Sequence, residues 1–230
     1  MTSNNKHLVT NNDNPTIMKN ILLGFGIMAL TTAVFAQGKD PKATALLDEV
    51  STKTKAYKTI QADFTYTMEN KQAKINETKT GVLLVSGDKY KLTASGQVVI
   101  CDGKTVWTYL KESNEVQVNN LENKDDALTP SKLLTSYNKN YKATIIKDRD
   151  AADPSLEAIE LIPNTQKNFT KAVLIVDKTK KQVRAFKLFD KSGNIFTYKV
   201  TKFLTDVRAT ASDFTFDTSN FPGVDVIDMR

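Results

Sequence analysis

Residues 61–69 read QADFTYTME, and their side chains alternate between apolar and polar at every second position. In an extended chain, successive side chains point to opposite faces. Phe64, Tyr66 and Met68 therefore share one face, and the threonines and acidic residues between them share the other. This pattern predicts a β-strand with one buried and one wet face.

Similar short runs continue along the chain on both sides of turn signals such as Ser86-Gly87-Asp88 and Asp102-Gly103. Glycine, asparagine and aspartate at such breaks favour tight turns between antiparallel strands. The pattern predicts a meander of about eleven strands. The further runs are 80–86, 89–93, 97–101, 105–110, 115–119, 141–147, 156–162, 171–177, 182–190 and 194–204, with a last piece at 214–216.

Two segments show helical rather than strand periodicity. Asp40-Pro41 is a typical helix start, with Asp as N-cap and Pro in the first turn, and an apolar stripe follows over 41–58. Thr129-Pro130 starts a shorter helix that ends near Tyr137. We expect both helices to lie on the apolar side of the sheet, with inward-facing residues Leu46, Leu47, Val50, Leu133 and Leu134.

Composition excludes several classes of protein. The chain has 230 residues, of which 40% are hydrophobic and 25% charged, and a net charge of +6. The single Cys101 excludes a disulfide scaffold and a zinc module, and the single His7 lies in the N-terminal segment that we expect to be removed, which excludes the common Ser-His-Asp and Cys-His mechanisms. The positive charge predicts a solvated lysine-rich face, or attraction to anionic headgroups or an acidic partner. No basic and aromatic cluster of a nucleic-acid module occurs.

The N-terminal region has the pattern of an export signal. Lys19 precedes an apolar run over 21–30, and small residues stand at Val34 and Ala36. We expect cleavage after Ala36, with Met18 as the true start. The mature chain, 37–230, is then a single exported domain in the periplasm, without the lone His.

The apolar faces of the strands are too extensive for two helices to cover. The sheet either closes into a filled barrel or curls around helices and leaves an apolar hollow, and the pattern leaves both open. If the strand phases are as predicted, the covered face carries Phe64, Tyr66, Met68, Leu83, Tyr90, Leu92, Trp107, Tyr109, Phe196 and Tyr198.

Several motifs, in order along the mature chain, resemble the outer-membrane lipoprotein carrier (LolA) family. They are YKTIQADFT at 57–65, GVLLV at 81–85 with KYKL at 89–92, CDGKTVWTY at 101–109, PSKLL at 130–134 and DFTF at 213–216 with PGVDVID at 222–228. The resemblance implies a mainly β fold with α-helix: an incomplete, unclosed antiparallel β-barrel with a helical lid over an apolar hollow.

The resemblance also implies a function. Family members carry lipoproteins across the periplasm by holding their acyl chains in the hollow, so the ten residues above are the expected lining and the five helix residues the lid. Implied partners are an inner-membrane lipoprotein-releasing transporter and a possible outer-membrane acceptor, and we expect a monomer without cofactors. Well-studied members have an Arg-Pro pair before the third strand that fastens the lid, where this chain has Ser86-Gly87-Asp88.

Other interpretations remain open. One is an exported lipid- or protein-binding scaffold that recruits a partner through an open sheet edge, with no lipoprotein transfer. Another is a secreted hydrolase, although Ser86-x-x-Lys89 and Lys79-Thr80-Gly81 stand in the wrong order for a penicillin-recognising enzyme. A third is a calcium site in the acidic loop of Asp148, Asp150 and Asp153, which lacks the spacing of a known loop.

Overall fold

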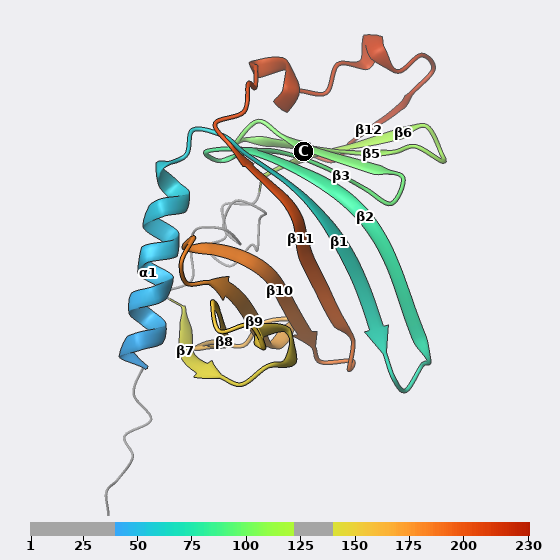
Figure 1. The fold of residues 1–230 in the computed structure, drawn as a ribbon. Coiled ribbons are helices and arrows are strands. Elements are labelled where there is room, and N and C mark those ends of the chain that lie inside the picture. The colour runs from blue at the N-terminus through green and yellow to red at the C-terminus, as the bar shows by residue number, and fades with distance from the viewer. Residues whose placement is uncertain (1–39, 122–139) are drawn as a thin grey trace, which may run out of the picture. The chain divides into compact units, whose positions relative to one another are not determined.

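The computed structural model describes residues 40–121 and 140–230 (Figure 1). They belong to the compact unit formed by residues 37–230. The one α-helix of the described residues is α1 (Pro41–Ala56). The strands are β1 (Ile60–Asn70), β2 (Ile75–Ser86), β3 (Lys89–Ala94), β4 (Gln97–Cys101), β5 (Thr105–Leu110), β6 (Glu115–Asn120), β7 (Tyr141–Ile146), β8 (Leu156–Pro163), β9 (Phe169–Asp177), β10 (Gln182–Asp190), β11 (Ile195–Thr205) and β12 (Asp225–Asp228). Three short 3-10 helices are η1 (Arg149–Ala151), η2 (Ala211–Phe214) and η3 (Thr218–Asn220).

The twelve strands of the described residues lie in one sheet, in the order β12-β6-β5-β4-β3-β2-β1-β11-β10-β9-β8-β7. Neighbouring strands are antiparallel, except that β12 runs parallel to β6. Strands β7 and β12 are the two edges, so the sheet is not closed. The predicted fold class, a mainly β protein with an unclosed antiparallel sheet and a helix, is confirmed.

Most of the predicted strands are confirmed, with three differences. Strand β2 begins at Ile75, five residues earlier than the sequence pattern suggested, because its polar first half pairs with the end of β1. Residues 214–216 are not a strand: Phe214 ends η2. The twelfth strand is instead at Asp225–Asp228. The predicted helix at 129–137 and the predicted export signal lie outside the described residues.

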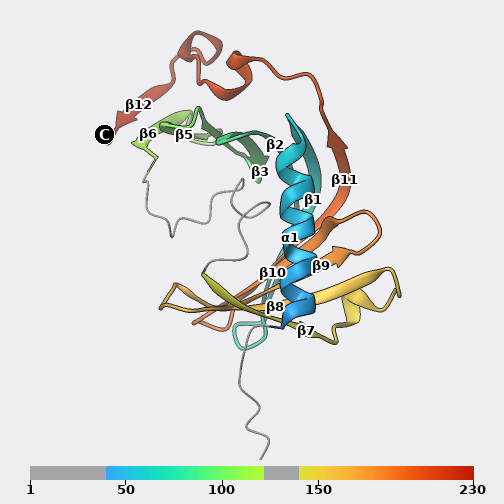
Figure 2. The same ribbon diagram turned by 90° about the vertical axis from the view of Figure 1, so that its left-hand side faces the viewer.

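The long strands β1, β2 and β11 bend around the side on which α1 lies (Figures 1 and 2). A register shift contributes to the bend, because Asp63 pairs with Lys202 and Phe64 pairs with Val200, which leaves Thr201 of β11 unpaired as a bulge. We call the face that α1 covers, with Phe64, Tyr66 and Met68 of β1, the inner face. The opposite face, with Asp63 and Thr65, is the outer face.

Asp40 fastens the start of α1 to the edge of the sheet. One carboxylate oxygen accepts hydrogen bonds from the backbone N–H groups of Lys42 and Ala43, at 2.9 and 3.3 Å. The other oxygen accepts the N–H of Ile145 in β7 at 3.2 Å. The Asp40 N–H donates to the carbonyl of Ala143 at 3.2 Å. These hydrogen bonds, above all the one from Ile145, hold the pKa of Asp40 below its usual value.

The apolar stripe of α1 packs on the inner face of β7–β10. Leu47 and Val50 are 1% and 0% exposed, and they belong to one cluster with fully buried side chains of β8 and β9 such as Ile159 and Leu174. Farther along α1, the Lys53 ammonium donates to the carbonyl of Lys180 at 2.9 Å. The helix is therefore attached to the sheet at both ends and along one side.

Candidate functional site

Aromatic and apolar side chains, all half-buried except the buried Phe64, gather on the inner face of β1, β10 and β11, next to the area that α1 covers. The Tyr66 ring lies 5.1 Å from the Tyr198 ring and 6.2 Å from the Phe196 ring, between centroids. Phe64 lies 5.9 Å from Tyr198, and Phe186 lies 6.3 Å from it. We call this group, together with Met68 and Leu188, the inner-face cluster.

The strand register extends this apolar face across β2 and β3. Phe64 of β1 pairs with Gly81 of β2, and two residues on, Leu83 pairs with Leu92 of β3. Tyr90, with 6% of its surface exposed, packs with Leu83 and the fully buried Cys101. The inner face thus carries all the predicted lining residues except Trp107 and Tyr109.

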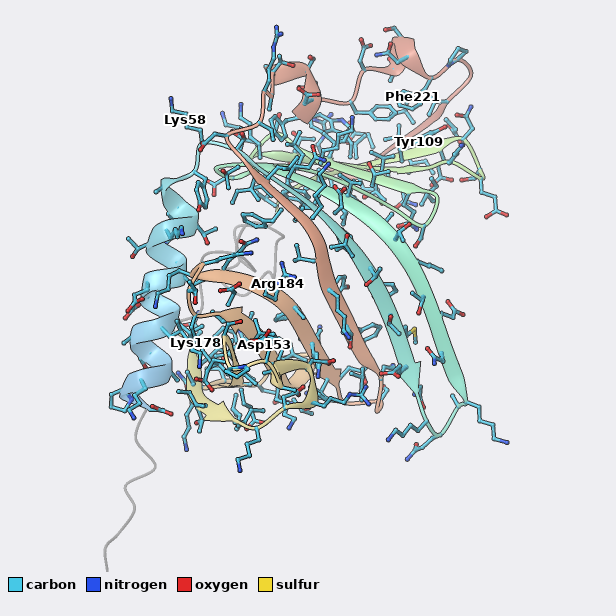
Figure 3. The ribbon with its side chains drawn as sticks, in the orientation of Figure 1. Lys58, Tyr109, Asp153, Lys178, Arg184 and Phe221 are labelled. Carbon is cyan, nitrogen blue, oxygen red and sulfur yellow. The ribbon has the colours of Figure 1, made fainter. Side chains whose placement is uncertain are left out.

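Trp107 and Tyr109 lie on the outer face, so the predicted phase of β5 was wrong. Both belong to a cluster covered by the chain that follows β11. The Tyr109 ring lies 4.5 Å from the Phe221 ring and 5.7 Å from the Phe216 ring (Figure 3). Strand β5 alternates these aromatics with Val106, Thr108 and Leu110, so both of its faces are suitable for burial, and alternation alone does not say which face is inner.

Sequence reasoning missed Phe186 and Leu188 of β10, which complete the cluster. They pair with Tyr198 and Phe196 across the β10–β11 hairpin. The available signal was the turn at 191–194, because residues at equal distances on either side of a hairpin turn face the same side of the sheet.

The predicted lid residues have two outcomes. Leu46, Leu47 and Val50 are buried between α1 and the sheet. Leu133 and Leu134 lie outside the described residues.

The inner-face cluster holds two phenol groups, those of Tyr66 and Tyr198. Burial is the main cause that raises the pKa of Tyr198 to about 12, and the nearby Tyr66 is a smaller cause. Burial and the Glu77 carboxylate raise the pKa of Tyr66. Both phenols are therefore neutral near pH 7 and can donate a hydrogen bond without bringing a charge to the apolar face.

Gly81 leaves room for the Phe64 ring. A Cβ atom built on Gly81 comes within 3.0 Å of two Phe64 ring atoms and of the Ala94 Cβ. We predict that Gly81→Val pushes the Phe64 ring off β2, disturbs its contact with Tyr198, and lowers the free energy of unfolding by about 1–3 kcal/mol. Chemical denaturation measures this change.

The matched control for Gly81→Val is Val82→Ala. Val82 is the next residue of β2, is 40% exposed and lies on the outer face, so its truncation should change stability by less than about 0.5 kcal/mol. Equal stability of Gly81→Val and the unmodified chain would show that the close packing of the Phe64 ring on Gly81 does not stabilise the fold.

Two hollows on the outer face are distinct from the inner-face cluster. One, of about 600 Å³, has a threonine-rich lining that includes Thr65, Thr80 and Thr93. The other, of about 520 Å³, is lined by charged and polar side chains around Lys187. The charged lining of the second hollow does not suit hydrocarbon, whereas the first mixes its threonines with Val82, Val98 and Tyr109.

The acidic loop considered for calcium is bound by lysines instead. The Lys187 ammonium lies 2.8 Å from Asp148 and 2.7 Å from Asp150. Lys199 is 3.1 Å from Asp150, and the Asp153 carboxylate accepts the N–H of Ser155 at 2.8 Å. Within residues 40–121 and 140–230, no three His, Cys, Asp or Glu side chains are grouped so that they could hold a metal ion.

The turn at Ser86-Gly87-Asp88 lies beside the C-terminal end of α1. The Ser86 hydroxyl donates to the carbonyl of Lys58 at 3.2 Å. The resemblance implies an arginine that fastens the helix in other family members. In this chain, Asp40 binds the N–H of Ile145 at the start of α1, and Glu49 of α1 forms a 2.5 Å ion pair with Lys181.

The described residues thus form an unclosed, mainly antiparallel sheet with one α-helix on its inner face and an uncharged aromatic cluster beside that helix. The sequence model of the outer membrane lipoprotein carrier protein LolA matches residues 55–217. The chain belongs to the LolA family.

The chain is also similar to solved structures. A conserved protein from Thermus thermophilus, described as uncharacterized, has a TM-score of 0.52 at 15% identity, over 81% of this chain and 99% of that chain. A putative outer membrane lipoprotein-sorting protein domain from Vibrio parahaemolyticus has a TM-score of 0.45 at 14% identity, over 76% and 96%. A LolA superfamily protein from Nitrosomonas europaea has a TM-score of 0.42 at 11% identity, over 76% and 97%. No curated protein matches the chain.

Proposed function

We propose that this protein is a periplasmic lipoprotein carrier that shields acyl chains on its inner face. The supporting observation is the inner-face cluster: neighbouring, uncharged aromatic and apolar side chains on β1, β10 and β11, of which all but the buried Phe64 are half-buried. Side chains of an ordinary core at the centre of a sheet are fully buried, as Leu174 and Val176 are under α1. An apolar face that stays partly accessible is suited to a removable apolar partner.

The physical chemistry of such a carrier needs neither a nucleophile nor a metal. Each methylene group removed from water contributes about 0.8 kcal/mol, so ten buried carbons give on the order of 8 kcal/mol before ordering costs. Aromatic rings and Met68 provide a large contact area with adaptable shape. The proposal is therefore a binding protein and not an enzyme.

The proposal includes export and the partners that the family implies. The signal pattern before Gln37 directs the chain to the periplasm, where a single domain receives lipoproteins from an inner-membrane transporter and delivers them to an acceptor at the outer membrane. Within the described residues, no helix is long and apolar enough to cross a membrane.

Binding of a diacylated lipopeptide to the purified protein tests the proposal. We predict that Met68→Asp and Leu92→Asp each weaken binding at least about tenfold, because a carboxylate on the inner face must lose its hydration when the acyl chain binds. Fluorescence of N-phenyl-1-naphthylamine, which increases in apolar surroundings, gives a second reading of the same site.

The control is Val82→Asp, which adds the same charge to the outer face at a position that is 40% exposed. It should leave lipopeptide binding unchanged. Binding that resists both inner-face substitutions, or that falls equally in Val82→Asp, would contradict the proposal.

A second candidate function is protein binding at the edge strand β12. Val226, Ile227 and Met229 are 48%, 39% and 51% exposed at this edge. An exposed apolar edge strand can pair with a strand of another chain. Two results together would favour this alternative. The purified protein would bind no lipopeptide, and it would retain an envelope protein that the Val226→Lys variant does not retain.

A further inference from the structure

The inner face is closed at one end and open at the other along β1. At the start of β1, Ile60 and Ala62 are each 4% exposed, and Val85 of the neighbouring β2 is 6% exposed. The Tyr57 and Phe203 rings, 6.4 Å apart, lie at this end as well. Farther along β1, Tyr66 and Met68 are only half-buried.

Polarity changes in the same direction along β2. Its inner-face residues from the closed end are Val85, Leu83 and Gly81, and they are followed by Lys79 and Glu77. Lys79 and Glu77 lie 3.5 Å apart as an ion pair, with about half of each side chain exposed. They stand directly opposite Tyr66 and Met68 of β1 in the strand register.

A hydrocarbon chain and its polar end have opposite requirements. Apolar carbon atoms gain most where they lose contact with water, while a carboxylate, ester or peptide group must keep water or hydrogen-bond partners. On this face, the residues of β1 and β2 at the closed end, Ile60, Ala62 and Val85, are apolar. The open end offers the ammonium of Lys79, water, and the neutral hydroxyl of Tyr66.

We infer that a bound lipid lies along β1 and β2 with its polar end at Lys79 and Glu77 and its hydrocarbon pointing toward Leu83 and Leu92. This inference rests on the proposed function and adds a direction to it. In an acylated lipoprotein the polypeptide is attached at the polar end of the lipid. The polypeptide of the cargo therefore leaves the carrier past the β1–β2 hairpin, at residues 71–74.

Depth-dependent fluorescence quenching tests the direction. The chain has one Trp, Trp107, which lies on the outer face. In a Trp107→Phe background, a new Trp is placed either at the open end, by Met68→Trp, or deeper, by Leu92→Trp. The probes are two stearic acids that carry a doxyl quencher near the carboxylate or near the methyl end.

We expect the probe labelled near the carboxylate to quench Met68→Trp at least twofold more than the probe labelled near the methyl end, and the order to reverse in Leu92→Trp. Trp107 of the unmodified chain, on the other face, should be quenched by neither probe. Circular dichroism checks that both variants are folded.

The outcomes separate the two proposals. Quenching of both variants in the opposite order, or to the same extent by both probes, would overturn the direction and leave the carrier function standing. No quenching of either folded variant would overturn the carrier function, and the direction with it.

A charge substitution provides a second measurement that leaves the apolar residues of the inner face unchanged. Lys79→Glu should weaken stearate binding about two- to fivefold, because it replaces an attractive charge near the carboxylate with a repulsive one. Lys104→Glu carries the same change in the β4–β5 turn, far along the sheet from Lys79, and should have no effect. An equal effect of both substitutions would contradict a polar end at Lys79.

Discussion

Lys187→Met is expected to lower the free energy of unfolding by about 3–5 kcal/mol, because it leaves the Asp148 carboxylate without a cation and removes the nearer of two cations from Asp150. Lys187 is 7% exposed in the middle of β10. Its ammonium binds both oxygens of Asp148, at 2.8 and 2.9 Å, and one oxygen of Asp150 at 2.7 Å. These contacts hold η1 over a buried cluster on the outer face of β8–β10. Urea denaturation measures the loss.

The control is Lys199→Met, which removes a neighbouring lysine from the same group. Lys199 also binds Asp150, at 3.1 Å, but half of its side chain is exposed. An exposed pair contributes about 0–1 kcal/mol, so this variant should be nearly as stable as the unmodified chain. Equal losses in the two variants would show that burial of the Lys187 pair is not the cause.

The same group predicts how the loss depends on pH. Burial opposes these charges, but the hydrogen bonds from Lys187 outweigh it and hold the pKa of Asp148 and Asp150 below the ordinary value of 3.8. The two carboxylates likewise raise the pKa of Lys187 above 10.5. The stabilisation from the carboxylates is therefore complete above pH 4 and is lost as the pH falls through their lowered pKa values. The difference between Lys187→Met and the unmodified chain should shrink below pH 4, and a constant difference would contradict this account.

Phe216→Ala is expected to lower the free energy of unfolding by about 3 kcal/mol, since large-to-small changes of a buried aromatic leave a cavity. Phe216 is 8% exposed and stacks on Phe221 with ring centroids 4.5 Å apart. With Tyr109, these rings fasten the segment between β11 and β12 across the outer face. The loss should be accompanied by faster hydrogen exchange in β5 and β6 and by a red shift of Trp107 fluorescence.

Val226→Ala, in the exposed edge strand β12, is the control for this prediction. Its side chain is 48% exposed, so truncation should change stability by less than about 0.5 kcal/mol. A Phe216→Ala variant with unchanged exchange in β5 and β6 would show that the C-terminal segment does not protect these strands.

The sequence predicted α1 and eleven of the strands because these elements depend on local signals. Asp40-Pro41 and the apolar stripe specify α1, and alternation with turn residues specifies each hairpin. The family motifs correctly indicated the unclosed sheet. Strand β12 escaped prediction because it has four residues and pairs in parallel with β6, more than 100 residues earlier in the chain.

The candidate site was also predictable in part, where it depends on alternation within single strands. Alternation in β1, β2, β3 and β11 correctly grouped Phe64, Tyr66 and Tyr198 with their neighbours on one face. It failed for β5, where Trp107 and Tyr109 lie under the C-terminal segment. The burial of Lys187 could likewise not be predicted from the sequence, because the loop with Asp148 that covers it is 39 residues earlier in the chain.

The sequence by itself determined which side chains of each strand share a face, because a period of two is a property of the extended backbone. Only the tertiary structure decided which of the two faces α1 covers and which the C-terminal segment and η1 cover. The reason is that burial of either face releases water, and the choice between them depends on contacts between segments far apart in the chain.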